Sequence, residues 1–318
     1  MSSEALLQLA LGNLGCSQKE LATRLGVSPT QISKWKKGDH ISLEMEGKLR
    51  DISKIGDLNP DVIVWTGSLE NARKWQNLIS HLAELAEMSG ETGYNTEPLQ
   101  DPNEHLCWST LLILKEMGIE IPKTFPEELP IDYDEHDEDL IEALDENPYT
   151  NIIYQIYKSL TNVYGFYYAY IYDLMYDDKL ELFETPAENI ESELIALAAS
   201  KLDVDERFAR NFRGFKYKTI SEFEKWLNIV KEAAFRAGIP LKAELLDLIY
   251  ESSEAIGYEA EAESLGFNKA RLHPDIYMNE LLVGMRTIHQ VLPAIMKKLG
   301  IEDEFQLNTS ELRLNSSE

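Results

Sequence analysis

The stretch SQKELATRLGVSPTQISKWKKG, residues 17–38, has the pattern of two short helices joined by a tight turn. The spacing predicts the first helix over 18–25, the turn at Gly26-Val27 and the second helix over 28–37. Glycine suits this turn because it has no Cβ and adopts a left-handed backbone without a clash. These two helices decide how the N-terminal part of the chain folds.

Both helices begin with recognisable N-terminal signals. Ser17 is a suitable N-cap for the first helix, and Glu20 three residues later completes a capping box. Ser28 is suited to cap the second helix, and Pro29 takes its first position, where a missing N–H costs nothing. Gly38 is suited to end that helix.

The apolar residues of the two helices each fall on one face. Leu21 and Leu25 are four residues apart and share a face. Ala22 is small enough to let another helix cross closely, and Ile32 and Trp35 are expected to face inward. The residues expected to face outward on the second helix are Thr30, Gln31, Ser33 and Lys34.

Over residues 4–55 this pattern resembles the lambda-repressor-like helix-turn-helix family, also called the XRE or Cro/C1 type. The resemblance implies that the second helix enters the DNA major groove and reads base edges with its N-terminal half. Many members pair a helix-1 Arg with a Glu of the second helix, whereas this chain has Leu11 and Lys36 there. Because both partners are replaced together, no orphaned buried charge results, and Lys36 becomes an extra charge that can approach phosphate.

The resemblance also assigns roles residue by residue. It places base contacts at four positions of the second helix: Pro29, Thr30, Ser33 and Lys34. It places phosphate contacts at Gln18 and Lys37. The complete set of residues that we expect at double-stranded DNA adds Ser28, Gln31 and Lys36.

The length of 318 residues corresponds to about two domains. We predict an all-α fold with a four- to five-helix lambda-repressor-like DNA-binding domain over 1–56. A larger acidic, mainly helical domain with at most minor strands is expected over 57–318, with a sub-boundary near 119–136. The linker is expected at Gly56 to Pro60.

The net charge of −26 is divided unevenly between these parts. Residues 1–55 carry 8 Lys/Arg and 6 Asp/Glu, a balance of +2, so the remainder carries −28. Residues 28–37 hold three lysines and no acid. Salt screens the repulsion between DNA and the acidic remainder beyond about 8 Å, so the N-terminal domain can bind if the body is held away from the phosphates. Few phosphates are neutralised, and we expect modest non-specific affinity.

Helical periodicity continues along the whole chain. The Val62–Trp65 run can be interpreted as a strand or as a packed extended segment. Residues 305–314 are compatible with a small hairpin. Pro293 is expected to kink or break the last helix. The other predicted helices cover residues 4–14, 42–55, 69–88, 106–117, 137–144, 151–176, 185–202, 221–237, 241–256 and 274–299.

The predicted helix over 151–176 carries eight of the fifteen tyrosines. Apolar or aromatic groups lie on every side of it, which is typical of a central helix. Tyrosine also suits surfaces that are part apolar and part polar, so an aromatic pocket or a dimer interface is the alternative. The two interpretations are compatible for different tyrosines.

One basic patch interrupts the acidic part of the chain. Ion pairing with the surrounding acids is the favoured interpretation, and a second nucleic-acid contact is the alternative. The patch consists of Arg207, Arg210, Arg213, Lys216 and Lys218.

Several other functions find no support in the sequence. The acidic run over 127–146 fails as a calcium loop because Asp137 and Ala143 stand where that loop needs Gly and Glu. The histidines are scattered, and His105 and Cys107 lack a second pair at metal spacing. No HExxH, phosphate-binding glycine loop or GxSxG occurs, so we expect no enzyme, cofactor or metal.

The expected location is the cytoplasm. Two cysteines argue against a disulfide framework. No signal peptide is recognisable at the N-terminus, and the 151–176 segment is too polar to span a membrane. We therefore expect a DNA-binding transcriptional regulator, such as a repressor, whose helical body forms a homodimer and senses an effector or partner. The alternative is a DNA-tethered interaction protein, antitoxin-like or a phage-defence subunit, whose acidic body binds a protein partner.

Overall fold

The computed structural model describes residues 3–101, 105–129, 146–267 and 274–301. Within these ranges all regular elements are α- or 3-10 helices, which confirms the predicted all-α class. The helix expected over 137–144 and the hairpin expected around 305–314 lie outside the described residues.

The N-terminal helices form a small bundle, here called the head (residues 3–53). They are α1 (Ser3–Leu14), α2 (Gln18–Leu25), α3 (Pro29–Trp35) and α4 (Leu43–Ser53). Helix α1 packs on α4 and α3, while α2 packs on α3. Their buried side chains form one apolar core: Leu6, Leu7, Ala10, Leu21, Ala22, Leu25, Ile32, Trp35 and Leu49.

The next segment corrects the sequence interpretation. Val62–Trp65 is neither a strand nor extended, because it lies in helix α5 (Pro60–Thr66). The Asn59 side chain accepts a hydrogen bond from the Asp61 amide, and Pro60 occupies the first turn. Val62 and Ile63 are buried where α5 packs on α1, α6 and α8, so tertiary burial overrides the β propensity of the branched residues.

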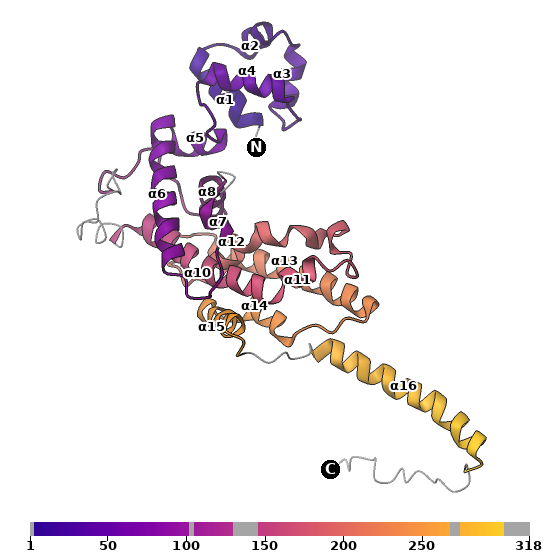
Figure 1. Cartoon of the computed structure of the whole chain (residues 1–318). Coiled ribbons are helices and arrows are strands. Elements are labelled where there is room, and N and C mark those ends of the chain that lie inside the picture. The colour runs from indigo at the N-terminus through magenta and orange to yellow at the C-terminus, as the bar shows by residue number, and fades with distance from the viewer. Residues whose placement is uncertain (1–2, 102–104, 130–145, 268–273, 302–318) are drawn as a thin grey trace, which may run out of the picture.

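The body (residues 60–264) is organised around one long helix, α10 (Pro148–Tyr170). It packs on α6 (Leu69–Met88), α12 (Ile190–Ser200) and α15 (Ser253–Ser264), as Figure 1 shows. Helix α8 (Leu106–Glu116) packs on α6 and α12, and the short α7 (Glu97–Gln100) packs on α6. No described helix is both long enough and apolar enough to cross a bilayer.

The tyrosines of α10 divide between core and surface. Tyr157, Tyr164, Tyr167 and Tyr170 are buried, as the core interpretation predicts. The next tyrosines extend an aromatic row beyond the core, with ring centroids 4.9 Å apart for Tyr168–Tyr172 and 4.6 Å apart for Tyr172–Tyr176. Tyr176 is exposed, and it follows the short helix α11 (Tyr172–Met175), which breaks the single helix expected over 151–176.

Two further predicted helices are divided in the structure. A 3-10 turn over Pro186–Asn189 precedes α12, after another at Leu182–Glu184. The helix expected over 241–256 is a 3-10 turn at Ala243–Leu246 and a short α14 (Asp247–Tyr250), followed by α15. The Ser252 side chain accepts from the Ala255 amide, and this cap begins a separate helix.

Helix α13 (Phe212–Ala237) begins nine residues before the expected Ser221. Phe212, Phe215 and Thr219 are buried at helical spacing, although the basic residues between them obscure that periodicity in the sequence. Four of the five basic-patch residues pair with nearby acids as favoured: Arg207 with Asp205, Arg210 with Glu120, Arg213 with Glu206, and Lys218 with Glu116. Lys216 forms no ion pair within the described residues.

The last helix, α16 (Pro274–Leu299), runs through Pro293 without a break, so the predicted break is wrong and the kink at Pro293 stays a prediction. Figure 1 shows α16 in yellow, projecting away from the body. No described helix makes an extensive packing contact with it.

Candidate nucleic-acid interface

The first helix of the α2–α3 unit is capped as predicted. The Ser17 hydroxyl accepts a hydrogen bond from the Glu20 amide at 3.4 Å, and the Ser17 amide donates to Glu20 Oε2 at 2.8 Å. These two bonds complete the capping box. The backbone hydrogen bond from Ser17 is the main reason that the pKa of Glu20 is lowered.

The turn between α2 and α3 has the geometry that its glycine permits. Gly26 has φ of 70°, in the left-handed region, and the Val27 amide donates to the Ala22 carbonyl at 3.0 Å. Ser28 then caps α3 by accepting from the Gln31 amide at 3.1 Å, and Pro29 is in its first turn. Short-range bonding therefore sets where α3 begins.

Burial sets which face of α3 points outward. Ile32 is fully buried and Trp35 is 5% exposed, so the opposite side of the helix faces solvent. The Ser3 hydroxyl donates to the Trp35 carbonyl at 2.8 Å, which ties the end of α3 to α1. Of the expected DNA contacts on α3, Pro29, Thr30, Ser33 and Lys34 are exposed and Gln31 is half-buried.

The remaining expected contacts lie at the two ends of the unit. Gln18 is half-buried at the start of α2, and Ser28 is exposed but its hydroxyl already serves as a cap. Helix α3 ends at Trp35, two residues earlier than predicted, so Lys36 and Lys37 lie in the turn that follows it. The structure thus gathers the nine residues on the α2–α3 unit, and their contact with DNA stays a prediction.

The exposed surface of α3 and the turn that follows it carries positive charges that are not used in intramolecular ion pairs among the described residues. Lys34, Lys36 and Lys37 are exposed, and none forms an ion pair within the described part of the chain. Lys218 of the body patch differs in this respect, since its Nζ lies 3.6 Å from Glu116 Oε2. An unpaired exposed lysine can approach phosphate without first breaking an intramolecular contact.

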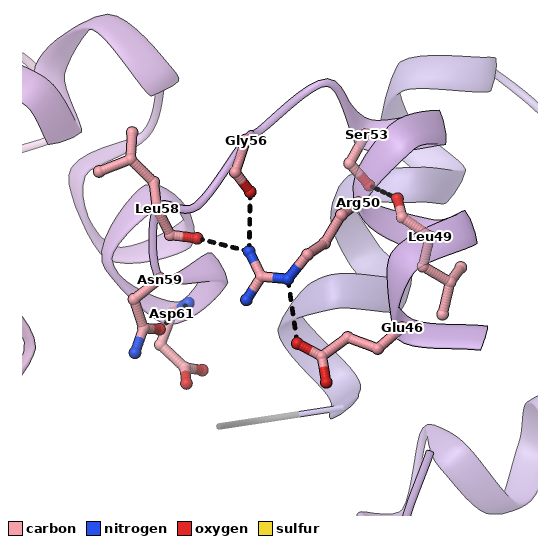
Figure 2. A network of polar contacts seen from close by, with 8 residues as sticks. All are labelled: Glu46, Leu49, Arg50, Ser53, Gly56, Leu58, Asn59 and Asp61. Atoms are coloured by element: carbon pink, nitrogen blue, oxygen red, sulfur yellow. Dashed lines mark hydrogen bonds and ion pairs between the residues drawn. The ribbon is translucent and has the colours of Figure 1, made fainter. Parts of the chain in front are cut away.

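The head joins the body through a network around Arg50, shown in Figure 2. Arg50 Nη1 donates to the Gly56 carbonyl at 2.9 Å and to the Leu58 carbonyl at 3.1 Å, while Nε donates to Glu46 Oε1 at 3.0 Å. The Arg50 side chain is only 17% exposed. The segment between α4 and α5, expected as a linker, is therefore held in place by hydrogen bonds from the Arg50 guanidinium to its backbone.

This junction positions the α2–α3 unit relative to the body. Helix α1 packs against α5, and Figure 1 shows α2 and α3 on the side of the head away from the body. Sequence reasoning missed Arg50. The signal that could have found it is an Arg four residues after Glu46 on the inward side of a helix that precedes a glycine turn.

The described body also holds a large cavity, with a volume of about 1130 Å³, between α8, α12 and α13. Trp108, Phe223 and Trp226 supply apolar walls, while Glu193 and Glu222 contribute carboxylates. Burial, followed by the charge of Glu222, raises the pKa of Glu193. The buried indole N–H of Trp226 has no hydrogen-bond partner within the described residues.

The described residues contain no group of three or more His, Cys, Asp or Glu side chains placed to hold a metal ion. Cys107 is buried in α8, and burial raises the pKa of its thiol to about 12. Its neighbour His105 stands at the start of the same helix.

The comparisons with known proteins concern the head. Residues 7–49 match a family model described as helix-turn-helix, and the rest of the chain is unmatched. No curated protein and no solved structure matches the chain. The matched residues run from α1 to α4 and include the α2–α3 unit, so the N-terminal part of the chain is a helix-turn-helix domain.

Proposed function

We propose that this protein is a sequence-specific DNA-binding transcriptional regulator that acts as a dimer, by binding and without catalysis. The observation that carries the proposal is the outer face of α3, where Thr30, Ser33 and Lys34 are exposed beside the unpaired Lys36 and Lys37. In this proposal α3 enters the major groove, its N-terminal residues read base edges, and the lysines and Gln18 hold phosphates.

Two copies are proposed because one small domain reads few base pairs. A pair of heads on half-sites about 34 Å apart, or a multiple of that distance, restores specificity through two-fold symmetry. The acidic remainder of the chain supports the same arrangement, since the charge of −28 on residues 56–318 disfavours broad contact with DNA and confines binding to the head.

The test is a comparison of variants on DNA. Duplexes are enriched from a random-sequence pool with the wild-type chain, and affinities are then measured by fluorescence anisotropy. We expect Thr30→Ala combined with Lys34→Ala to weaken specific binding by about tenfold or more, because a base contact contributes about 1–3 kcal/mol of discrimination. A footprint on the promoter of the protein's own gene should be lost in parallel.

The matched control is Gln8→Ala combined with Lys48→Ala, which removes an exposed amide and an exposed lysine from α1 and α4 of the same head. This variant should retain wild-type affinity. Unchanged binding by the α3 variant, or an equal loss in the control, would show that α3 is not the reading helix.

The cavity of the body supports a second candidate function, in which the acidic body binds a basic protein partner while the head tethers it to DNA. Aromatic walls from Trp108 and Trp226, with the carboxylates of Glu193 and Glu222, fit a basic amphipathic helix laid into a groove. Burial is the main reason that the pKa of Glu193 is raised, and the charge of Glu222 adds to it; the positive side chains of such a helix would offset that second contribution.

A synthetic basic amphipathic helical peptide tests this candidate, with tryptophan emission as the readout. We expect saturable binding that Glu193→Gln combined with Glu222→Gln weakens at least fivefold. The control variant, Glu232→Gln with Glu254→Gln, removes the same charge from exposed positions outside the cavity. Equal affinity for the two variants would mean that the cavity is not the binding site.

A further inference from the structure

Helix α16 presents an apolar stripe to solvent. Six residues separated by alternating steps of four and three make up this stripe, and each is between 42% and 65% exposed. They are Leu281, Met285, Ile288, Leu292, Ile295 and Leu299.

The spacing of the stripe averages 3.5 residues, which is the repeat of a left-handed coiled coil. A helix with this repeat keeps the same seam against a partner helix along its whole length, and each side chain inserts between four of the partner. A lone helix gains little stability in water from propensity alone, and large exposed apolar patches mark interaction sites. The stripe therefore indicates a helical partner.

We propose that α16 pairs with α16 of a second copy of this chain, in antiparallel orientation, and that this pair is the dimer interface of the protein. An identical helix supplies the same alternating spacing, so the two stripes interdigitate along their full length. This interface would be the one through which the proposed DNA-binding regulator dimerises, so the inference rests on the proposed function in that respect. The evidence for the interface itself comes from α16 alone.

The distribution of charge along α16 favours the antiparallel orientation. Asp275 and Glu280 lie in its first two turns, and Lys297 and Lys298 lie in its last turn. Antiparallel pairing brings the acidic end of one helix beside the basic end of the other, and it opposes the two helix dipoles. It also places the two acidic bodies at opposite ends of a helix about 39 Å long, which limits their mutual repulsion.

Among the described side chains of α16, three other large apolar residues are exposed outside the stripe: Leu282 and Val291 lie on its two flanks, where they can widen the seam, and Val283 lies on the outer face. Thr287, Gln290 and Pro293 are exposed and fall outside the stripe, and the Thr287 hydroxyl donates to the Val283 carbonyl at 2.9 Å. Because Pro293 lies on this outer face, its ring does not interrupt the packing of the seam.

Sedimentation or light-scattering mass of the full chain without DNA tests the pairing. The wild type should have twice the chain mass of 36.3 kDa. Ile288→Glu combined with Leu292→Glu should shift the mass to that of one chain. Thr287→Glu combined with Gln290→Glu adds the same charge to the outer face of α16 and should leave the dimer intact.

A wild-type monomer at about 100 µM, or a stripe variant that remains dimeric, would overturn the proposal. A monomer whose α16 amides resist hydrogen exchange would show instead that the helix docks on its own body. Orientation is tested with spin labels on Lys298→Cys in a Cys16→Ser background. Antiparallel copies should give a distance of about 25–35 Å from the rise of the helix, whereas parallel copies would give a much shorter one and contradict the orientation.

This experiment separates the two proposals. The Thr30→Ala, Lys34→Ala variant should remain dimeric by mass while it loses DNA. If that variant keeps its DNA affinity while the wild type is dimeric, the proposed function fails and the α16 interface stands. If the wild type is monomeric and still binds DNA through α3, only the interface fails.

Discussion

Glu20 shows how one exposed side chain helps to form the α2–α3 unit. Its carboxylate accepts a backbone hydrogen bond from Ser17, and this bond lowers its pKa below the ordinary value of 4.5. Because the folded-state pKa is the lower one, the stabilisation is complete above the unfolded value and is lost as pH falls through the folded value. The capping box should therefore hold at neutral pH and weaken only in acid.

We predict that Ser17→Ala destabilises the head by about 1 kcal/mol, since it removes an N-cap hydroxyl. It should also move the pKa of Glu20 back toward 4.5, because the hydroxyl bond to that carboxylate is lost. A carbon-detected NMR titration of Glu20 and urea unfolding measure the two effects. Ser42→Ala, which removes the cap of α4, is the control: it should destabilise the head and leave the Glu20 titration unchanged. A shifted titration in the control would contradict the local origin of the effect.

At the scale of elements, the contact between α8 and α13 is close enough to demand glycine. Gly118 follows α8 with φ of +84°, and a Cβ there would lie 2.6 Å from the Asn211 amide nitrogen. That amide donates to the Met117 carbonyl at 2.9 Å, and the Asn211 side chain donates to the Glu116 carbonyl at 2.8 Å. The start of α13 thus supplies hydrogen bonds to the end of α8.

We predict that Gly118→Ala destabilises the body by about 1–3 kcal/mol, because it combines an unfavourable φ with a clash against backbone. Gly12→Ala in α1 is the control, since a Cβ there meets nothing within 4 Å and alanine favours the helix by about 0.5–1 kcal/mol. Thermal unfolding of both variants is the measurement. A neutral result for Gly118→Ala would mean that α8 and α13 are less closely packed.

At the scale of the whole molecule, Arg50 determines how the head is held on the body. We predict that Arg50→Lys keeps the charge, loses the forked hydrogen bonds to the Gly56 and Leu58 carbonyls, and costs about 1–2 kcal/mol. Hydrogen exchange over residues 54–59 should accelerate as a result. Lys48→Ala breaks only the exposed pair with Glu44 and should leave this segment unchanged. Wild-type exchange in Arg50→Lys would argue that α1–α5 packing alone holds the junction.

The uneven charge of head and body leads to a second prediction at this scale, which concerns the salt dependence of DNA binding. Binding to DNA should weaken with salt, with a slope of log affinity against log salt of about −0.9 for each phosphate that is neutralised. Lys37→Ala should reduce the magnitude of the slope by about 1 for each head bound. Anisotropy titrations at several salt concentrations measure it. Lys218→Ala in the ion-paired body patch should leave the slope unchanged, and a flat response in the wild type would exclude phosphate contact.

The sequence by itself determined the head and the long helices. Ser17, Glu20, Gly26 and Ser28 act through hydrogen bonds and backbone angles within a few residues, so their pattern predicted the caps and the turn that the structure has. Helix α6 was predicted over its observed range, Leu69–Met88, because its apolar period is unbroken. The candidate DNA contacts lie together on the α2–α3 unit because they are close neighbours in the chain.

Only the tertiary structure decided the features that depend on distant neighbours. Val62 and Ile63 belong to a helix because α1, α6 and α8 bury them there, which a short β-branched run cannot reveal. The bond from Arg50 to a turn six to eight residues away and the cavity between α8, α12 and α13 exist only once the helices are packed. The alternating apolar spacing of α16 was present in the sequence. The fold decided that no described helix packs extensively on α16, because the burial of a helix depends on where the rest of the chain lies.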